Sequence, residues 1–190
     1  MLSHDELRFL RESINILKND FERHPNKFLT EDDMRVHLCS LLLNRFGDLE
    51  ETGDNDRSIP IHTEVRWYGR QGKLRYRSDI VIIDVSSLIV KKVSGLKMPT
   101  KGYGFNMPKA IIELKLRRPD GDSHKIFKSK VEKDCEKLNS IKYELIEGVD
   151  NYEIFCFVIA FDKKGVIDSV DCPDGIHLVY SSSFLTSDGN

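Results

Sequence analysis

Two acidic residues and a lysine lie within apolar stretches of this chain, where charged side chains are uncommon. Asp79 begins the apolar run that continues to Ile83, and Glu113 and Lys115 are one residue apart in the segment KAIIELKLRR at 109–118. Side chains alternate between the two faces of a β-strand, so Glu113 and Lys115 would share a face. Burying a charge is costly unless it is paired or binds a metal ion. The pattern therefore predicts a polar site on one face of a sheet.

The chemistry available to such a site follows from its functional groups. Two carboxylates on neighbouring strands, Asp79 and Glu113, offer the oxygen ligands that Mg²⁺ prefers and leave positions for water and phosphate. An ammonium group at Lys115 could orient the nucleophile or assist its deprotonation. This set predicts metal-dependent phosphodiester hydrolysis, with all three residues catalytic. The alternative is an edge strand on which Glu113 and Lys115 are simply solvated.

The chain before these strands predicts two helices with recognisable starts. Ser3 and Glu6 form a capping-box pattern ahead of an apolar stripe, which predicts a helix over about 4–22. Thr30 begins a second helical pattern that ends at Gly47. The acidic, turn-rich stretch that follows is expected to be a loop.

The remainder of the chain predicts strands around one long helix. From residue 59 the apolar period becomes two, and GRQG at 69–72 is typical of a hairpin connection. Ser123 can cap a helix that closes near Gly148. The expected strands share apolar runs between turn residues and cover 59–67, 74–83, 109–118, 154–161 and 176–180. Helices before and between these strands predict a mixed sheet with helices on its faces.

The sequence RSDIVIID at 77–84, followed by IIELK at 111–115, resembles the motif of the PD-(D/E)xK nuclease superfamily. The resemblance implies an α/β protein with a restriction-endonuclease-like αβββαβ core and a mixed central sheet flanked by helices. It covers about 30–162 of a single domain at 1–190, leaving an extra N-terminal helix and an added C-terminal strand. Ser78 stands where the family name has proline, which is not one of the chemical groups.

The resemblance also implies residue roles. Asp79 and Glu113 would be metal ligands together with the carbonyl group of Leu114, and Lys115 would be the catalytic lysine. The cofactor would be Mg²⁺, with Mn²⁺ as a substitute. The implied enzyme is an endodeoxyribonuclease that hydrolyses phosphodiester bonds. A protein that keeps this fold and binds nucleic acid without cleaving it is the alternative.

Many members of the superfamily carry one more acidic residue at the site, and this chain offers two. Glu31 lies seven residues before Leu38 and so faces the core side of its helix. Its other interpretation is a first-turn acid favoured by the helix dipole. Glu64 lies on the polar face of the first strand, where it could also pair across the hairpin with Arg75 or Arg77.

Charge is strongly segregated along the chain. Residues 66–118 contain thirteen Lys or Arg and three acidic residues, a net charge of +10, whereas the rest of the chain carries −12 within a total of −2. Segregation of this kind favours a polyanionic partner, although a solvated basic face is the alternative. We expect nucleic acid, DNA rather than RNA, and leave a homodimer open. The candidate contact residues are Arg75, Arg77, Lys101, Arg117, Lys130 and Lys133.

Two further groups of residues are weaker candidates for nucleic-acid contact. Tyr103 and Phe105 lie among lysines in a long Gly- and Pro-containing loop, and could stack on bases or fill the core. Lys137 shares one side of the long helix with two of the candidates above, a pattern also typical of a solvated face. Asp134, on the same helix, is expected to have a structural role.

Composition limits the class of protein. The chain has 190 residues, of which 39% are hydrophobic and 32% charged, as in a globular domain. Its longest apolar run, 154–161, has eight residues, too few to span a membrane. The four cysteines are widely spaced without a CxxC pair, and we see no targeting signal. These features predict a cytoplasmic protein in a reducing compartment.

Overall fold

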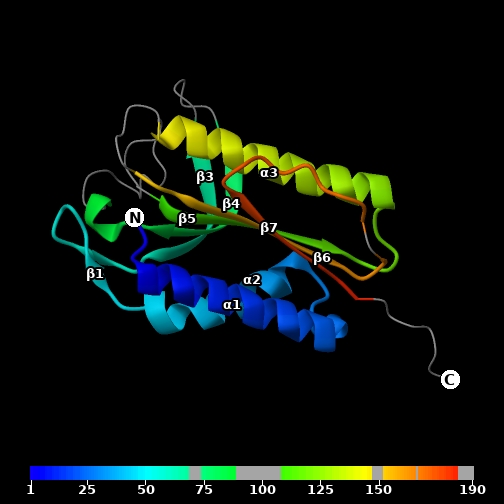
Figure 1. Cartoon of the computed structure of the whole chain (residues 1–190). Helices are drawn as coiled ribbons and strands as arrows, with labels where there is room; N and C mark the ends of the chain where they lie inside the picture. Colours follow the sequence, from blue (N-terminus) through cyan, green and yellow to red (C-terminus); the bar gives the residue numbers. More distant parts are fainter. Residues whose placement is uncertain (69–73, 89–107, 147–151, 166, 184–190) are drawn as a thin grey trace.

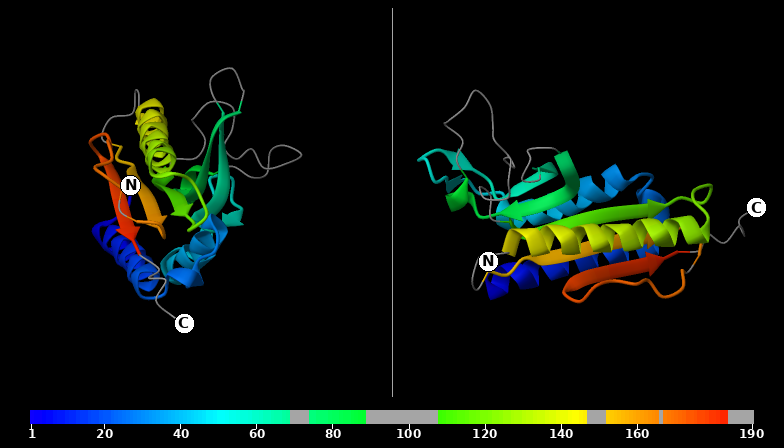
Figure 2. Two further views of the ribbon diagram at one scale, coloured as in Figure 1. Left: turned by 90° about the vertical axis from the view of Figure 1, so that its right-hand side faces the viewer. Right: turned by 90° about the horizontal axis from the view of Figure 1, so that it is seen from above.

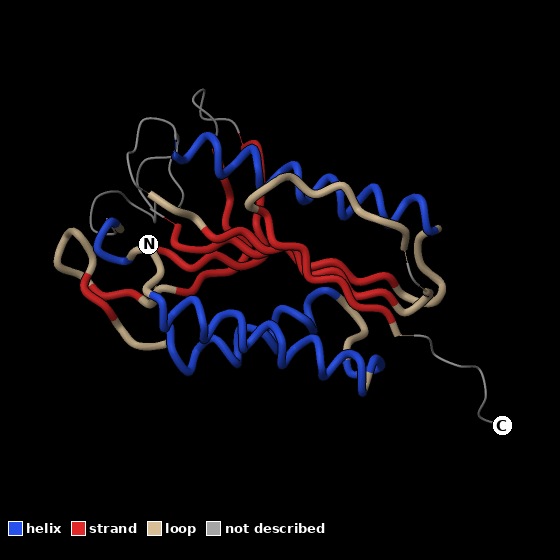
Figure 3. The backbone as a smooth tube through the Cα atoms, viewed as in Figure 1, coloured by secondary structure: helices blue, strands red, loops and turns tan. Residues whose placement is uncertain are grey.

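The computed structural model describes residues 1–68, 74–88, 108–146, 152–165 and 167–183. Within this part of the chain, a mixed five-stranded sheet lies between helix α3 on one face and helices α1 and α2 on the other (Figures 1 and 3). The expected class, an α/β protein with helices against a mixed sheet, is confirmed. No described helix is long and apolar enough to cross a membrane.

The helices begin where their capping residues lie. Helix α1 (His4–Arg23) starts after Ser3, whose side chain accepts a hydrogen bond from the Glu6 N–H group in a complete capping box. Helix α2 (Glu31–Phe46) starts after Thr30, which forms a capping box with Asp33. Helix α3 (His124–Ile146) completes the set, and a short 3₁₀ turn (Pro25–Lys27) links α1 to α2. These starts agree with the sequence prediction because capping depends on neighbouring residues.

The strands form one sheet in the order β3-β4-β5-β6-β7. Pairs β3–β4 and β4–β5 are antiparallel, whereas β5–β6 and β6–β7 are parallel, with α3 connecting β5 to β6. The bounds are β3 (Ile61–Tyr68), β4 (Leu74–Ile83), β5 (Pro108–Arg117), β6 (Phe155–Asp162) and β7 (Ile176–Ser182). The expected strands are therefore present, while the connection at 69–72 lies outside the described residues.

A small addition interrupts the stretch that the sequence predicted to be only a loop. Strands β1 (Glu50–Glu51) and β2 (Arg57–Ser58) pair in an antiparallel hairpin, and a 3₁₀ turn (Val85–Ser87) follows β4. The Thr52 N–H group bonds to the Asp56 carbonyl oxygen at 2.9 Å and closes the hairpin. These pairs lack an apolar alternation, so the sequence carries no strand signal there.

The sheet has a separate apolar core on each face. Ile112 and Leu114 of β5 pack with α1 and α2, whereas Ile111 and the alternate residues of β6 pack with α3. Because side chains alternate, Glu113 lies on the α3 side among apolar neighbours. Figure 2 shows the same three layers end-on, with the β3–β4 pair rising beside α3.

One irregularity in the sheet creates the site. The pairing of β4 with β5 begins at Ile80 opposite Ile112, whereas β5 stays paired with β6 as far as Arg117. Beyond Ile112, β4 therefore leaves β5 and turns with β3 toward α3 (Figure 2). The β4-facing edge of β5 is consequently open at Leu114 and Leu116.

Candidate active site

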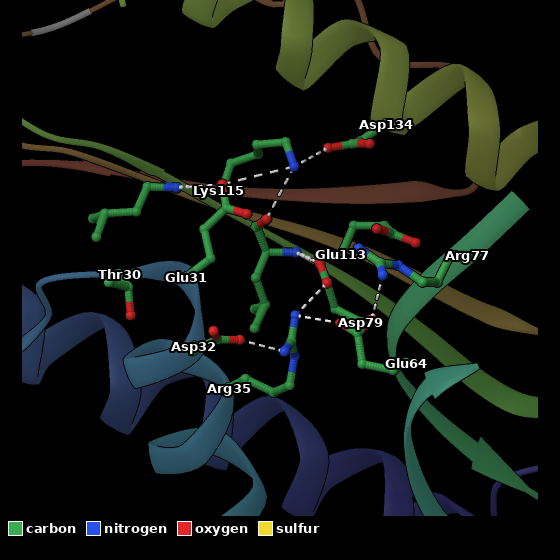
Figure 4. Close-up of polar contacts among 12 residues, drawn as sticks. Thr30, Glu31, Asp32, Arg35, Glu64, Arg77, Asp79, Glu113, Lys115 and Asp134 are labelled. Carbon is green, nitrogen blue, oxygen red and sulfur yellow. Dashed lines mark hydrogen bonds and ion pairs between the residues drawn. The ribbon is translucent and has the colours of Figure 1, made fainter. Parts of the chain in front are cut away.

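Two carboxylates bind the open edge of β5 where β4 has left it. The Leu114 N–H group donates to Asp79 Oδ2 at 2.8 Å, and the Leu116 N–H group donates to Glu31 Oε1 at 3.3 Å. Alternate N–H groups of a strand point to the same neighbouring strand, so these carboxylates replace carbonyl groups that β4 no longer supplies. Asp79 and Glu31 are thereby fixed side by side along β5 (Figure 4).

Asp79 is also held by an arginine that the sequence did not single out. Arg35 Nη2, from α2, lies 2.7 Å from Asp79 Oδ1 and 2.7 Å from Glu64 Oε1, and Nη1 pairs with Asp32. Burial alone would lower the pKa of the Arg35 guanidinium, but the hydrogen bond and charge of Asp79, with Glu64 and Asp32, raise it. Arg35 is therefore a permanent cation that joins three carboxylates.

Glu64 occupies an unusual backbone conformation beside this cation. Its φ angle is 56°, in the left-handed region, which costs a non-glycine residue about 1 kcal/mol. Its other oxygen, Oε2, pairs with Arg77 Nη1 at 2.9 Å, so the predicted cross-hairpin pair forms. Glu64 and Asp79 both contact the same nitrogen of Arg35. Backbone strain of this kind is concentrated at functional sites.

Glu113 is almost completely buried on the α3 side. Its side chain is 2% exposed, Oε2 pairs with Lys137 Nζ at 2.6 Å, and Oε1 has no hydrogen-bond partner. Burial raises the pKa of the Glu113 carboxyl to about 8 against the opposing charge of Lys137, with the charges of Asp79 and Asp134 adding to the rise. This carboxyl group therefore takes up a proton near neutral pH unless more positive charge is supplied.

Lys115 projects between helices α2 and α3 (Figure 4). Its Nζ lies 3.1 Å from Asp134 Oδ2 and 3.7 Å from Glu31 Oε1, and donates to the Leu114 carbonyl oxygen at 3.3 Å. Burial lowers the pKa of the Lys115 ammonium, but Asp134, Glu31 and Asp79 outweigh it and raise the pKa. Lys115 therefore stays charged, which suits the stabilisation of negative charge better than the removal of a proton.

A polar cleft of about 900 Å³ lies beside these groups and is lined by Lys115 but not by Asp79 or Glu113. Its walls come from the start of α2, the end of β5 and one side of α3. The charged residues that line it include Glu31, Arg35, Glu64, Arg77, Lys115, Arg118, Lys130, Lys133 and Asp134. Four of the predicted nucleic-acid contacts, Arg77, Arg117, Lys130 and Lys133, therefore line the same cleft. Lys130 also pairs with Asp122 at 2.6 Å.

Two further predicted nucleic-acid contacts, Arg117 and Arg75, are engaged in ion pairs. Arg117 also lines the cleft, but it is 3% exposed and its Nε donates to Asp162 Oδ1 at 2.8 Å, so a contact with nucleic acid stays a prediction for this residue. Arg75 pairs with Glu144 of α3. Lys101, with the loop aromatics Tyr103 and Phe105, lies outside the described residues. The pair of Arg117 with Asp162 was not predicted, because the two residues are 45 positions apart in sequence.

Two residues of α3 belong to the site more closely than the sequence indicated. Lys137 is half-buried, and its Nζ contacts Glu113 at 2.6 Å and Asp134 Oδ1 at 3.2 Å, so it is not part of a solvated face. Asp134 is 8% exposed among the apolar positions of the same helix face. An acidic residue in an apolar stripe was the available signal, because buried carboxylates need partners.

The carboxylates fit a hard divalent cation in part. Asp79, Glu113 and the Leu114 carbonyl oxygen lie along one stretch of β4 and β5, and Glu113 Oε1 is buried without a donor. Mg²⁺ commonly uses one or two carboxylates and completes its shell with water. Across the described ranges, no group of three or more His, Cys, Asp or Glu side chains is arranged to hold a metal ion. Such an ion would therefore depend on backbone and water ligands.

The fold and the site together define an α/β protein with a mixed sheet and a polar cleft, lined by Glu31, Lys115 and Asp134, beside the place where β4 leaves β5. A comparison of the chain with protein-family models, curated proteins and solved structures found no match. The function of this protein is therefore inferred from the chemistry of the cluster.

Proposed function

We propose that this protein is a metal-dependent nuclease of the PD-(D/E)xK type, with a restriction-endonuclease-like core, and that DNA is its substrate. One observation carries the proposal. Where β4 leaves β5, Asp79 accepts a hydrogen bond from the Leu114 N–H group, between Glu113 and Lys115, and Lys115 lines the cleft. The separation of β4 from β5 leaves unpaired backbone groups of β5 next to charged side chains. A cluster of ion pairs with only a structural role would not need this gap in the sheet.

Each residue has a distinct part in this proposal. Asp79 and Glu113, with the Leu114 carbonyl group, would hold Mg²⁺, which activates water and neutralises charge on the phosphate. Lys115, kept protonated by Asp134 and Glu31, stabilises negative charge developing on the phosphate oxygens. Binding of the ion would favour the ionised form of Glu113, whose pKa is raised by burial that the charge of Lys137 does not offset.

The cleft supports a phosphodiester substrate. Arg77 is 60% exposed on one wall although it pairs with Glu64, and Lys133 is exposed on the α3 wall. Cationic side chains on opposite walls can contact successive phosphates of a backbone that crosses the acidic base. The cluster alone would repel a polyanion, so these cations are needed to bring the substrate to it.

Cleavage by the purified protein tests the proposal. We expect plasmid DNA to be nicked or cut with Mg²⁺ or Mn²⁺ and to stay intact with EDTA. The cleavage rate should fall at least about 100-fold in Asp79→Asn, Glu113→Gln and Lys115→Met, which is on the order of one general acid–base or oxyanion contribution. Lys18→Met is the matched control, because Lys18 pairs with Glu22 on the far helix α1. Cleavage that persists in all three site variants would refute the assignment.

A second function is favoured by a specific observation. Arg35 already pairs with Asp79, and Lys137 with Glu113, so the cluster carries its own counter-ions. A fold that binds nucleic acid without cutting it would need no further cation. Salt-dependent DNA binding without cleavage in Mg²⁺ or Mn²⁺ would favour this binding module over the nuclease.

A further inference from the structure

Two thiols that are distant in sequence meet on the face of the sheet that α3 covers. Cys135, on α3, and Cys172, in the segment between β6 and β7, have their Sγ atoms 2.8 Å apart. Both are free thiols, and they are separated by 37 residues. Their spacing carries no sequence motif, so only the fold reveals the pair.

The backbone that leads to Cys172 is anchored at two points. The Asp171 N–H group donates to Glu132 Oε1 of α3 at 3.3 Å, one residue before Cys172. The Ile167 N–H group donates to the Tyr180 hydroxyl oxygen of β7 at 3.1 Å. The segment accordingly runs along α3 (Figures 1 and 3). A disulfide needs sulfur atoms about 2.05 Å apart, so closure needs a sulfur movement of less than about 1 Å.

We propose that Cys135 and Cys172 are a redox-active dithiol, which a peroxide oxidises to an intramolecular disulfide and a small-molecule thiol reduces again. In the first step the Cys172 thiolate attacks one peroxide oxygen, the O–O bond breaks, and hydroxide leaves to become water. In the second step the Cys135 sulfur attacks the Cys172 sulfenic acid, the S–O bond breaks, and water leaves. The two thiols lose two electrons, which reduce the peroxide to two waters.

The order of the two steps follows from accessibility. Cys172 is half-buried and can meet an oxidant from solvent, whereas Cys135 is buried. Burial, together with the Cys172 thiol, raises the pKa of the Cys135 thiol, so Cys135 stays protonated and reacts only with a partner beside it. This assigns Cys172 as the residue that the oxidant attacks and Cys135 as the one that resolves it.

The disulfide would act on the helix that contacts the acidic cluster. Asp134, next to Cys135, and Lys137, two residues further on, contact Lys115 and Glu113. Cross-linking therefore fastens this part of α3 to the edge of the sheet beside β7. The chemistry of the dithiol does not depend on the proposed nuclease activity, so it can be tested without a substrate.

The test uses the full chain, treated with hydrogen peroxide and then with dithiothreitol. We expect peroxide to remove two thiols, to lower the mass by two hydrogens and to yield a linked peptide pair containing Cys135 and Cys172. The melting temperature should rise by about 5–10 °C, as expected when a cross-link closes a loop of this size. Dithiothreitol should restore the starting mass and melting temperature.

Matched variants separate this result from general oxidation. Cys172→Ser removes the half-buried partner without opening the core and should abolish the linked peptide and the rise in melting temperature. Cys39→Ser, which removes the half-buried cysteine of α2, should change neither. A linked pair that involves another cysteine, a disulfide between chains, or an unchanged rise in Cys172→Ser would overturn the proposal. The proposal would also be overturned if Cys135 and Cys172 stayed reduced in excess peroxide.

Discussion

Replacing Glu113 with glutamine tests the most unusual group in the site. The Glu113 carboxyl is buried between β5 and α3, beside the Lys137 ammonium, with one oxygen lacking a hydrogen-bond donor. Its pKa is raised from the ordinary value of 4.5 to about 8, and burial is the main cause. Glutamine keeps the shape of the side chain and cannot ionise, so Glu113→Gln removes the titration and leaves the packing.

The sign of the effect follows from proton binding. Between pH 4.5 and about 8 the folded protein holds a proton on Glu113 that the unfolded chain has lost. The stabilisation from this group is thus complete below pH 4.5 and is lost as pH rises through about 8. In this window the free energy of unfolding should fall by about 1.4 kcal/mol per pH unit, or about 5 kcal/mol in all. That is a large part of the stability of an ordinary domain.

Urea denaturation at several pH values from about 5 to 8, without divalent metal, measures this slope. The difference between wild type and Glu113→Gln isolates Glu113, because all other titrating groups are common to both. Glu136→Gln, at an exposed position on helix α3, is the control, and its stability should change with pH as that of the wild type does. Placing glutamine beside Lys137 changes the free energy of unfolding by the same amount at every pH, so its slope against pH is not affected.

Parallel stability curves for wild type and Glu113→Gln would refute this reasoning. They would mean that Lys137 keeps Glu113 ionised throughout, so that burial does not dominate. The prediction would also be contradicted if the free energy of unfolding of Glu113→Gln fell more steeply with rising pH than that of the wild type. Either result would also show that the positive charge of Lys137 offsets the effect of burial on the Glu113 carboxyl.

Two other substitutions test the ion pairs around the sheet. Arg35→Met should lower the free energy of unfolding by about 1–3 kcal/mol, because Asp79 loses its partner, and Mg²⁺ should stabilise this variant more than wild type in urea titrations. An equal Mg²⁺ effect on both proteins would show that Arg35 does not compete with the ion. Arg117→Met should cost about 3–5 kcal/mol by the same measurement, because it leaves Asp162 buried without its cation. A cost below about 1 kcal/mol would contradict the buried pair, and adding Asp162→Asn should recover part of the loss.

Local patterns predicted the elements well. The capping residues at Ser3 and Thr30 mark the starts of α1 and α2, and Gly47 lies at the end of α2 as expected. Capping and apolar periodicity depend on residues a few positions apart, so they can be read from the chain without knowing the fold. The hairpin β1–β2 was missed because its strands have two residues each and no apolar alternation.

The central candidates were selected from the sequence for a different reason. Asp79, Glu113 and Lys115 interrupt apolar runs, and a charge in such a run indicates a paired or ligand-binding group. Ser78 illustrates the limit of the motif, because it is buried and accepts a hydrogen bond from Trp67 Nε1 at 2.9 Å. The position that departs from the superfamily pattern therefore has a structural partner of its own.

Partners across the sheet were decided only by tertiary structure. Arg35 reaches Asp79 across 44 residues of chain, and Cys135 meets Cys172 across 37. These contacts depend on where β4 leaves β5 and on how α2 and α3 lie against the sheet. The sequence by itself determined which segments form helices and strands and which side chains carry charge into them, because those properties are local. Which charges meet was decided by packing, since alternation assigns a side chain to a face and cannot name its neighbour on the next layer.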